Sequence, residues 1–258
     1  MNAVLQARAP DMHPDEWQAR VQLAAAYRIF DMLGWTEMIY NHITVRLPDS
    51  VTHGEKQFLI NPFGLHYSEV TASNLLKIDV QGNKLDAANP WPVNPAGFTI
   101  HSAIHRARSD VNCVLHTHTR AGIAISALRE GLLPISQIAL QFYNRLAYHD
   151  YEGIALDLAE RARLVKDLGD KPVIILRNHG LLTAGASVAE AFSLMFYLER
   201  ACEIQIAALS TGRELIVPTP KVCEKAAQQY EEDDEPAGTR EWRALLRQLD
   251  RTDPSYRE

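Results

Sequence analysis

The sequence predicts a layered α/β domain. Stretches with apolar residues at helical spacing alternate along the chain with short runs of β type. Pro and Gly separate these stretches as turn and stop signals. The 258 residues suit one large domain or two small ones, and 47% hydrophobic against 22% charged residues is typical of a globular chain. Elements that alternate in this way pack as layers around a shared core.

The first half of the chain is expected to open with a flexible arm over residues 1–13. An amphipathic helix follows, which Pro14 begins and Gly34 ends. Thr71 can cap a short helix, and Asn94 can cap a longer one that runs to about residue 108. This half also holds three β-type runs, at residues 42–47, 57–60 and 77–80.

The second half contains the longest expected helix. Ser187 and Glu190 form a capping-box pattern at its start, and it ends near Gly212. An acidic run at residues 231–235 precedes the last helix. The other elements expected here are a β-type run at 112–119, helices at 120–128 and 154–168, an apolar strand at 172–177 and the last helix at 241–249.

Charge and cysteine usage exclude several classes of protein. Lys and Arg total 26 against 32 Asp and Glu, and this net charge of −6 argues against nonspecific nucleic-acid binding. The three cysteines, Cys113, Cys202 and Cys223, form no CxxC pair, so neither a disulfide framework nor a thiolate zinc site is expected. No secretory leader is visible and no apolar run approaches the ~20 residues that cross a bilayer. We expect a cytoplasmic protein without a membrane partner.

Three histidines form a candidate metal site. His116 and His118 are two residues apart in a predicted strand, so their side chains point to the same face. His179 follows the apolar strand that ends at Arg177, and Gly180 permits a tight turn there. Three imidazoles leave a coordination position open, as in catalytic zinc sites. Fe, Mn, Co and Ni are compatible with the same nitrogen ligands.

A second histidine pair competes with this set. His101 and His105 are four residues apart on the helix after Asn94, so they share a face. They can lie at the surface, bind a metal directly or orient a ligand histidine from behind, and we favour the last of these.

The motifs around these residues resemble the class II aldolase/adducin family. They are His116-Thr117-His118-Thr119-Arg120-Ala121-Gly122, Asn178-His179-Gly180-Leu181, and the stretches at residues 39–44, 62–73, 96–104, 131–136 and 148–151. The resemblance spans roughly residues 17–209. It implies a three-layer α/β/α sandwich with a mostly antiparallel central sheet, a homotetramer, and a divalent metal, zinc first, on His116, His118 and His179. It also implies a family domain over residues 14–212. Residues 213–258 then form an acidic extension with a terminal helix, packed on the same domain or on a neighbouring subunit.

Two departures from the family pattern bear on the reaction. The sugar-phosphate aldolases carry a glutamate that moves the substrate proton, and Gly97 stands at that position here. Their phosphate-binding turns correspond to residues 41–44 and 61–64, where Phe63 lacks a hydroxyl. The resemblance implies substrate contacts at Asn41, Thr44, Asn61, Gly64 and Asn94.

The sequence leaves three functions open. The first is a metal-dependent lyase that cleaves an aldol or decarboxylates a small hydroxy or keto acid, or a sugar-derived substrate, through a metal-stabilised enolate. The second is a non-catalytic, adducin-like scaffold, and the third is an Fe(II)-dependent oxygenase. The proton donor is not identified by the sequence; His101, Tyr143 and Tyr148 are candidates, and each is equally consistent with packing.

Overall fold

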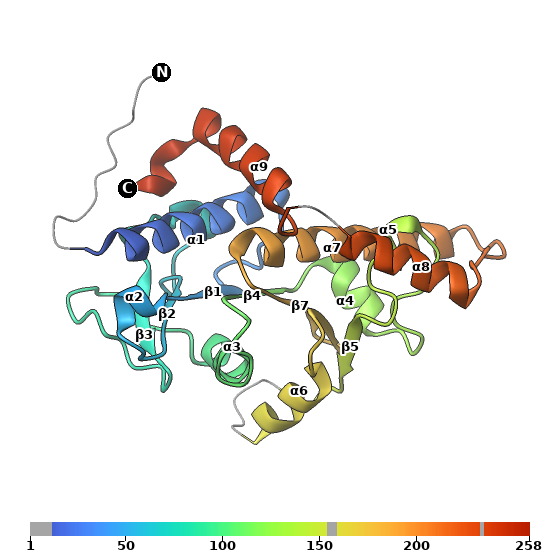
Figure 1. Cartoon of the computed structure of the whole chain (residues 1–258), viewed down its shortest axis with the longest axis horizontal. Coiled ribbons are helices and arrows are strands. Elements are labelled where there is room, and N and C mark those ends of the chain that lie inside the picture. Colours follow the sequence, from blue (N-terminus) through green and yellow to red (C-terminus); the bar gives the residue numbers. More distant parts are fainter. Residues whose placement is uncertain (1–11, 154–158, 233–234) are drawn as a thin grey trace.

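The computed structural model describes residues 12–153, 159–232 and 235–258. Its centre is one seven-stranded sheet in the order β3-β2-β1-β4-β7-β6-β5, with helices on both faces (Figure 1). The strands are β1 (His42–Arg46), β2 (Gln57–Ile60), β3 (Leu76–Asp79), β4 (Cys113–Thr117), β5 (Leu146–His149), β6 (Val173–Leu176) and β7 (Gly180–Gly185). The expected three-layer α/β/α sandwich is therefore confirmed.

The sheet is mixed, with a single parallel pair among its described strands. β5 and β6 run parallel, and every other neighbouring pair is antiparallel. At the centre, β1 pairs with β4 so that His42 lies opposite His116. β4 also pairs with β7, where His116 lies opposite Leu182. The central strands thus bring segments that are far apart in the sequence to one end of the sheet.

The helices divide between the two faces (Figure 1). The larger core joins the sheet to α1 (Pro14–Leu33), α4 (Arg120–Ser126), α7 (Val188–Ser210) and α9 (Thr239–Thr252). The opposite core joins it to α3 (Pro95–Ala107) and α6 (Glu160–Leu168). Shorter or peripheral helices are α2 (Asp49–Thr52), α5 (Gln137–Leu140), α8 (Pro220–Glu231) and the 3₁₀ turns η1 (Tyr67–Glu69) and η2 (Pro254–Arg257).

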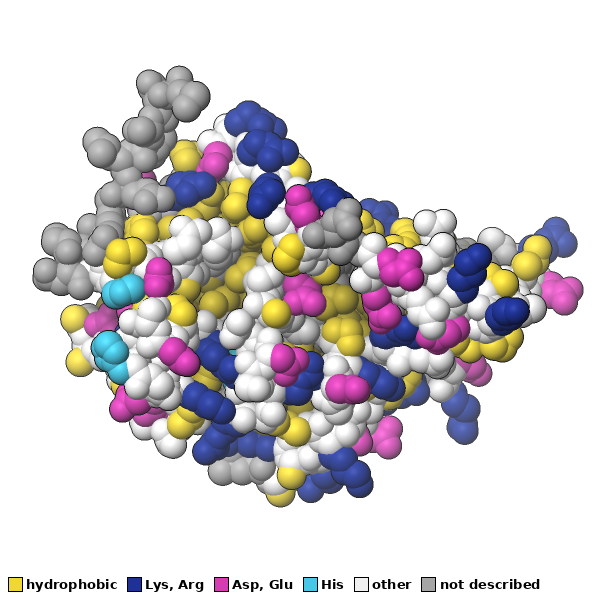
Figure 2. Space-filling model, viewed as in Figure 1, with side chains coloured by type: hydrophobic (Ala, Val, Ile, Leu, Met, Phe, Trp, Pro, Cys, Tyr) yellow, Lys and Arg dark blue, Asp and Glu magenta, His cyan; other side chains and the backbone are white. Residues whose placement is uncertain are grey.

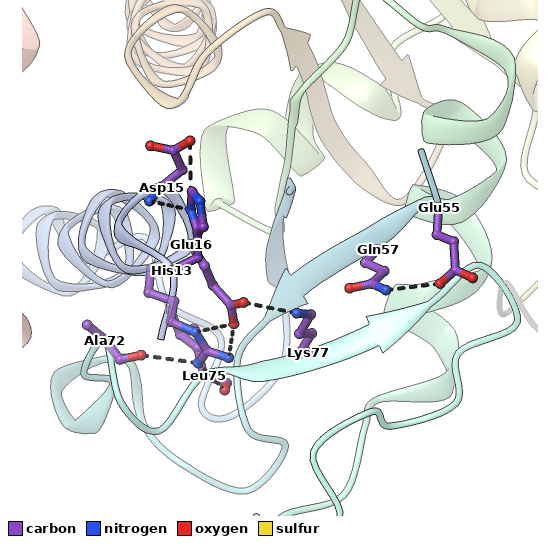
Figure 3. Close-up of polar contacts among 9 residues, drawn as sticks. His13, Asp15, Glu16, Glu55, Gln57, Ala72, Leu75 and Lys77 are labelled. Atoms are coloured by element: carbon purple, nitrogen blue, oxygen red, sulfur yellow. Dashed lines mark hydrogen bonds and ion pairs between the residues drawn. The ribbon is translucent and has the colours of Figure 1, made fainter. Parts of the chain in front are cut away.

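The first helix carries a buried ion-pair cluster. Arg20 is 3% exposed and donates to the Glu16 carboxylate and to the carbonyls of Ala72 and Leu75. The ammonium of Lys77 on β3 donates to the other Glu16 oxygen at 2.9 Å (Figure 3). Every charge in the cluster therefore has a partner, and the cluster ties α1 to the edge of the sheet.

The extension after α7 packs on the same chain. Trp242 of α9 is buried with its ring 5.4 Å from that of Phe192, and its indole N–H donates to Gln22 of α1. At the end of the extension, Arg28 pairs with Asp253, and Tyr256 is fully buried. These contacts cover α1 and α7 on the side away from the sheet.

Several expected elements differ from the structure. Thr71 caps no helix; its backbone N–H donates to Asn74 Oδ1 in a turn. The helix expected from residue 154 begins at Glu160, and residues 154–158 lie outside the described part, as do residues 1–11 of the expected arm. β5, β7 and α8 were not expected.

The surface is mixed in charge on the face that Figure 2 shows, where acidic and basic side chains lie interspersed. Within the described residues, no helix has both the length and the apolarity needed to cross a membrane.

Candidate functional site

The three predicted ligand histidines converge at the end of the central strands. His116 Nε2 lies 2.8 Å from His118 Nε2 and 3.2 Å from His179 Nε2. His116 stands on β4, His118 follows the last residue of that strand, and His179 occupies the turn between β6 and β7. Within the described chain, this is the one group of His, Cys, Asp and Glu side chains whose ligand atoms come close enough for one ion.

The turn that carries His179 depends on its two neighbours. Asn178 has a φ of 55°, in the left-handed region that Asn tolerates better than most residues. A Cβ on Gly180 would lie 2.2 Å from the carbonyl oxygen of Thr117, so only glycine lets the turn approach β4 this closely. The chain therefore places the His179 ring beside the two histidines of β4 through local backbone requirements.

Hydrogen bonding and burial leave the ring nitrogens able to bind a cation. His116 Nδ1 donates to the Leu181 carbonyl at 2.9 Å, which leaves Nε2 with its lone pair in the neutral ring. Burial lowers the pKa of His116 and of His118, and it lowers that of His179 to about 4, so all three rings are neutral near pH 7. Two nitrogen ligands of tetrahedral zinc lie roughly 3.4 Å apart, close to the observed separations. The residues fit a divalent cation.

A cavity of about 460 Å³ opens beside the three histidines. Ile100 and Ile123 give it apolar surface, and the Tyr151 ring lies 6.5 Å from that of His179. The remaining described residues of this wall are Glu37, Tyr40, Asn41, His42, Asn94, Gly153 and Asn178. We refer to this cavity as the pocket.

Gly97 lies against the side chain of His42. A Cβ on Gly97 would lie 2.6 Å from Cγ of the His42 ring, so the imidazole fills the space that any side chain at position 97 would need. His42 is 5% exposed, and neither of its ring nitrogens has a hydrogen-bond partner. Burial lowers its pKa to about 3, so the ring is neutral.

Behind His42 lies a buried network of side chains. The His101 ring is 4.2 Å from that of His42, and its Nδ1 is 2.8 Å from the Thr44 hydroxyl. The same hydroxyl is 2.8 Å from Nε2 of His105. A hydroxyl donates only one hydrogen bond, so at least one of these imidazoles donates to the Thr44 oxygen. His101 and His105 thus support the site from behind and do not join the three ligand atoms.

The other candidate residues separate into two groups. Asn41 and Asn94 line the pocket, whereas Thr44 lies in the network behind it. Asn61 accepts a hydrogen bond from the Tyr27 hydroxyl. The candidate residues that the structure places outside the pocket wall are Thr44, Asn61, Gly64, His101, Tyr143 and Tyr148.

Tyr148 has a packing role. Its hydroxyl accepts from the backbone N–H of Leu132, and the Arg177 guanidinium lies 4.1 Å from its ring centroid.

Sequence reasoning missed His42, Glu37 and Tyr151 as pocket residues. The position of His42, directly opposite His116 across the β1–β4 ladder, was the available signal, but it required the strand pairing to be known.

Three imidazoles that converge beside an open cavity on a mixed seven-stranded sheet define an α/β protein with a candidate metal centre. The family model for the Class II Aldolase and Adducin N-terminal domain matches residues 21–206. The chain belongs to this family, as its motifs predict.

Individual relatives agree with that assignment. An aldolase II superfamily protein from Pseudomonas syringae with a solved structure is 52% identical, with a TM-score of 0.90 over 96% of this chain and 98% of that one. An L-fuculose 1-phosphate aldolase from Glaciozyma antarctica is 28% identical, with a TM-score of 0.82 over 97% of each chain. Alpha-adducin from Rattus norvegicus is 51% identical over 195 residues, which are 75% of this chain and 26% of the adducin.

Proposed function

We propose that this protein is a metal-dependent carbon–carbon lyase, an aldehyde-lyase or a carboxy-lyase, that acts on a small hydroxy or keto acid or a sugar-derived substrate. The observation that carries the proposal is the convergence of three neutral imidazole nitrogens beside the pocket. Membership of the class II aldolase family and similarity to an L-fuculose 1-phosphate aldolase support a lyase. We expect zinc as the metal, a homotetramer and a cytoplasmic location.

Each residue of the site has a role in this proposal. A divalent cation on Nε2 of His116, His118 and His179 would polarise a substrate oxygen and stabilise the negative charge left when a carbon–carbon bond breaks. The Leu181 carbonyl fixes the His116 ring in the required tautomer. Ile100 and Ile123 offer apolar surface against which the carbon skeleton of the substrate would pack.

Gly97 favours decarboxylation over aldol cleavage. Aldol cleavage needs a base to take the proton of the substrate hydroxyl, and the position that supplies this base in the sugar-phosphate aldolases is glycine here. Loss of CO₂ from a β-keto acid needs no such base, because the electron pair of the breaking bond passes to the β-carbonyl and only a proton donor must follow. The Tyr151 side chain lines the pocket and carries a hydroxyl that can donate such a proton.

Metal analysis tests the site. Protein purified without a metal-affinity column should carry about one divalent ion per chain, and His116→Ala and His179→Ala should lose it. His53→Asn is the matched control, because His53 is an exposed histidine outside the pocket whose left-handed backbone Asn also tolerates. Equal, near-zero metal in wild type and variants refutes the proposed lyase.

A substrate screen tests the reaction. Hydroxy and keto acids are assayed for CO₂ or carbonyl product with and without a chelator, in air and under anaerobic conditions. Metal-dependent product without oxygen supports a lyase, whereas a strict need for oxygen identifies an Fe(II) oxygenase. The similarity to alpha-adducin favours a scaffold as the second candidate function, and metal-independent assembly with no turnover would support it.

A further inference from the structure

Two buried side chains in the pocket wall have polar atoms without a protein partner. Asn41 is 3% exposed, and both its amide oxygen and its amide nitrogen lack hydrogen bonds. His42 beside it has two such nitrogens. Buried polar groups in folded proteins are almost always paired, and an unpaired one costs about 1–3 kcal/mol. Both residues line the pocket, so a ligand in the pocket is the candidate partner for these atoms.

Packing holds the His42 ring in this position. Its backbone is fixed opposite His116 in the β1–β4 ladder. The first turn of α3, at Gly97, occupies one side of the ring, and the His101 ring lies on another. Thr44 in turn fixes His101 through its Nδ1. The ring therefore lies between α3 and the His101 side chain.

Asn41 is held by its backbone. Its φ of 69° places it in the left-handed region directly before β1 begins. The side chain is therefore directed by the turn and not by a hydrogen bond of its own. Together the amide and the imidazole offer donors and acceptors without charge.

The charges of the residues that line the pocket limit which ligands Asn41 and His42 can bind. Glu37 lines the pocket, and none of the lining residues that the structure describes is Lys or Arg. Away from the metal that the three histidines would hold, a phosphate dianion would meet the Glu37 carboxylate and no lysine or arginine side chain, which is unfavourable in a partly buried site. A singly charged carboxylate or a neutral carbonyl or hydroxyl needs only the hydrogen bonds that Asn41 and His42 can supply.

We infer that the pocket takes an unphosphorylated hydroxy or keto acid, and that Asn41 and His42 select it. This inference rests on the proposed function, because the lyase site is what the substrate would occupy. The ring of His42 fills the volume next to Gly97, so a histidine at 42 and a glycine at 97 form a matched pair. In this pair, the neutral imidazole of His42 on β1 occupies the space that a side chain at position 97 would otherwise fill.

Binding of two matched probes tests the selectivity. Glycerate and 3-phosphoglycerate differ only in a phosphate ester, and isothermal titration calorimetry of the intact protein, as purified, gives their Kd values at pH 7. Glycerate should bind at least as tightly as 3-phosphoglycerate. His42→Phe keeps the ring volume, Asn41→Gly keeps the left-handed backbone, and each should weaken glycerate binding about tenfold. His53→Asn, at an exposed position outside the pocket, should leave it unchanged.

The inference is overturned by any of three results: tenfold tighter binding of 3-phosphoglycerate, no glycerate binding at tens of millimolar, or unchanged glycerate affinity in both pocket variants. Absent metal or absent lyase activity in wild type would refute the proposed function alone. Active lyase that prefers phosphorylated substrates would refute this inference alone.

A thermal-stability cycle tests the matched pair without any ligand. Gly97→Ala should lower Tm, because its Cβ meets the His42 ring, and the same change in a His42→Ala background should lower Tm much less. Equal losses in the two backgrounds would show that the pair is not coupled.

Discussion

A buried carboxylate on α7 makes the stability of this protein depend on pH in a direction opposite to that of most acidic residues. Glu199 is 4% exposed and accepts a hydrogen bond from the Thr119 hydroxyl. Burial raises the pKa of Glu199 to about 6, more than the Thr119 hydrogen bond lowers it. At pH 7 the folded protein therefore holds a charged carboxylate in surroundings that disfavour it.

The sign follows from proton binding. Between pH 4.5 and about 6 the folded state holds the Glu199 proton more firmly than the unfolded state does, so raising the pH through this window lowers the free energy of unfolding. The displacement of the pKa from 4.5 to about 6 corresponds to about 2 kcal/mol at pH 7. Glu199→Gln keeps an acceptor for Thr119 and removes the charge. We expect it to stabilise the protein by up to about 2 kcal/mol at pH 7, which raises Tm by about 4–8 °C.

Thermal unfolding scans from pH 4 to pH 7.5 measure this effect as the difference in Tm between variant and wild type. The gain should be full above pH 6 and should vanish below pH 4.5. Glu203→Gln is the control, because Glu203 lies on the same helix but pairs with Arg200 at the surface. A gain for Glu199→Gln that does not change with pH, or a gain of equal size for Glu203→Gln, would refute the reasoning.

Three further predictions concern the core, the histidines and the end of the chain. Arg20→Met should lower the free energy of unfolding by roughly 3 kcal/mol or more in denaturant unfolding, because it leaves the buried Glu16 with Lys77 alone. Arg20→Met combined with Glu16→Leu should recover much of this loss, and no recovery would contradict the ion-pair explanation. Chelator-treated protein should lose stability as the pH falls from 6.5 towards 4. Burial holds the pKa of His42 at about 3 and that of His179 at about 4, so both rings take up protons on unfolding. His42→Asn should show a shallower loss of stability with falling pH in thermal scans, and an unchanged slope would contradict this explanation. Tyr256→Ala should destabilise the protein by about 3–5 kcal/mol, measured by urea unfolding, because the fully buried ring leaves a cavity against α1; a loss below 1 kcal/mol would show that η2 is not part of the core.

The sequence predicted the elements whose ends carry strong local signals. Pro14 and Gly34 bound α1, and Gly34 takes the left-handed conformation with a φ of 70°. Ser187 accepts from the Glu190 backbone N–H at the start of α7, as the capping pattern predicts. These signals act within a few residues of the element they end, so no tertiary knowledge is needed to use them.

The missed elements depend on partners elsewhere in the chain. β7 has the sequence Gly-Leu-Leu-Thr-Ala-Gly, which lacks the β-branched and alternating pattern of a strand, and its place between β4 and β6 stabilises it. α8 carried one usable signal, Pro220 at its first position. The sequence could group His116 and His118 by strand alternation, whereas the contact between His42 and Gly97 follows only from the pairing of β1 with β4 and the placement of α3.

Two parts of the site differ in how many substitutions their surroundings permit. The three histidines depend on backbone features of the central strands and of one tight turn, so few substitutions are compatible with them. His42, which we propose selects the substrate, stands on β1 and faces Gly97 in the first turn of α3, where a side chain at one position takes the space of a side chain at the other. Substitutions at positions 42 and 97 can therefore change which substrate binds, while the three metal-binding histidines stay the same.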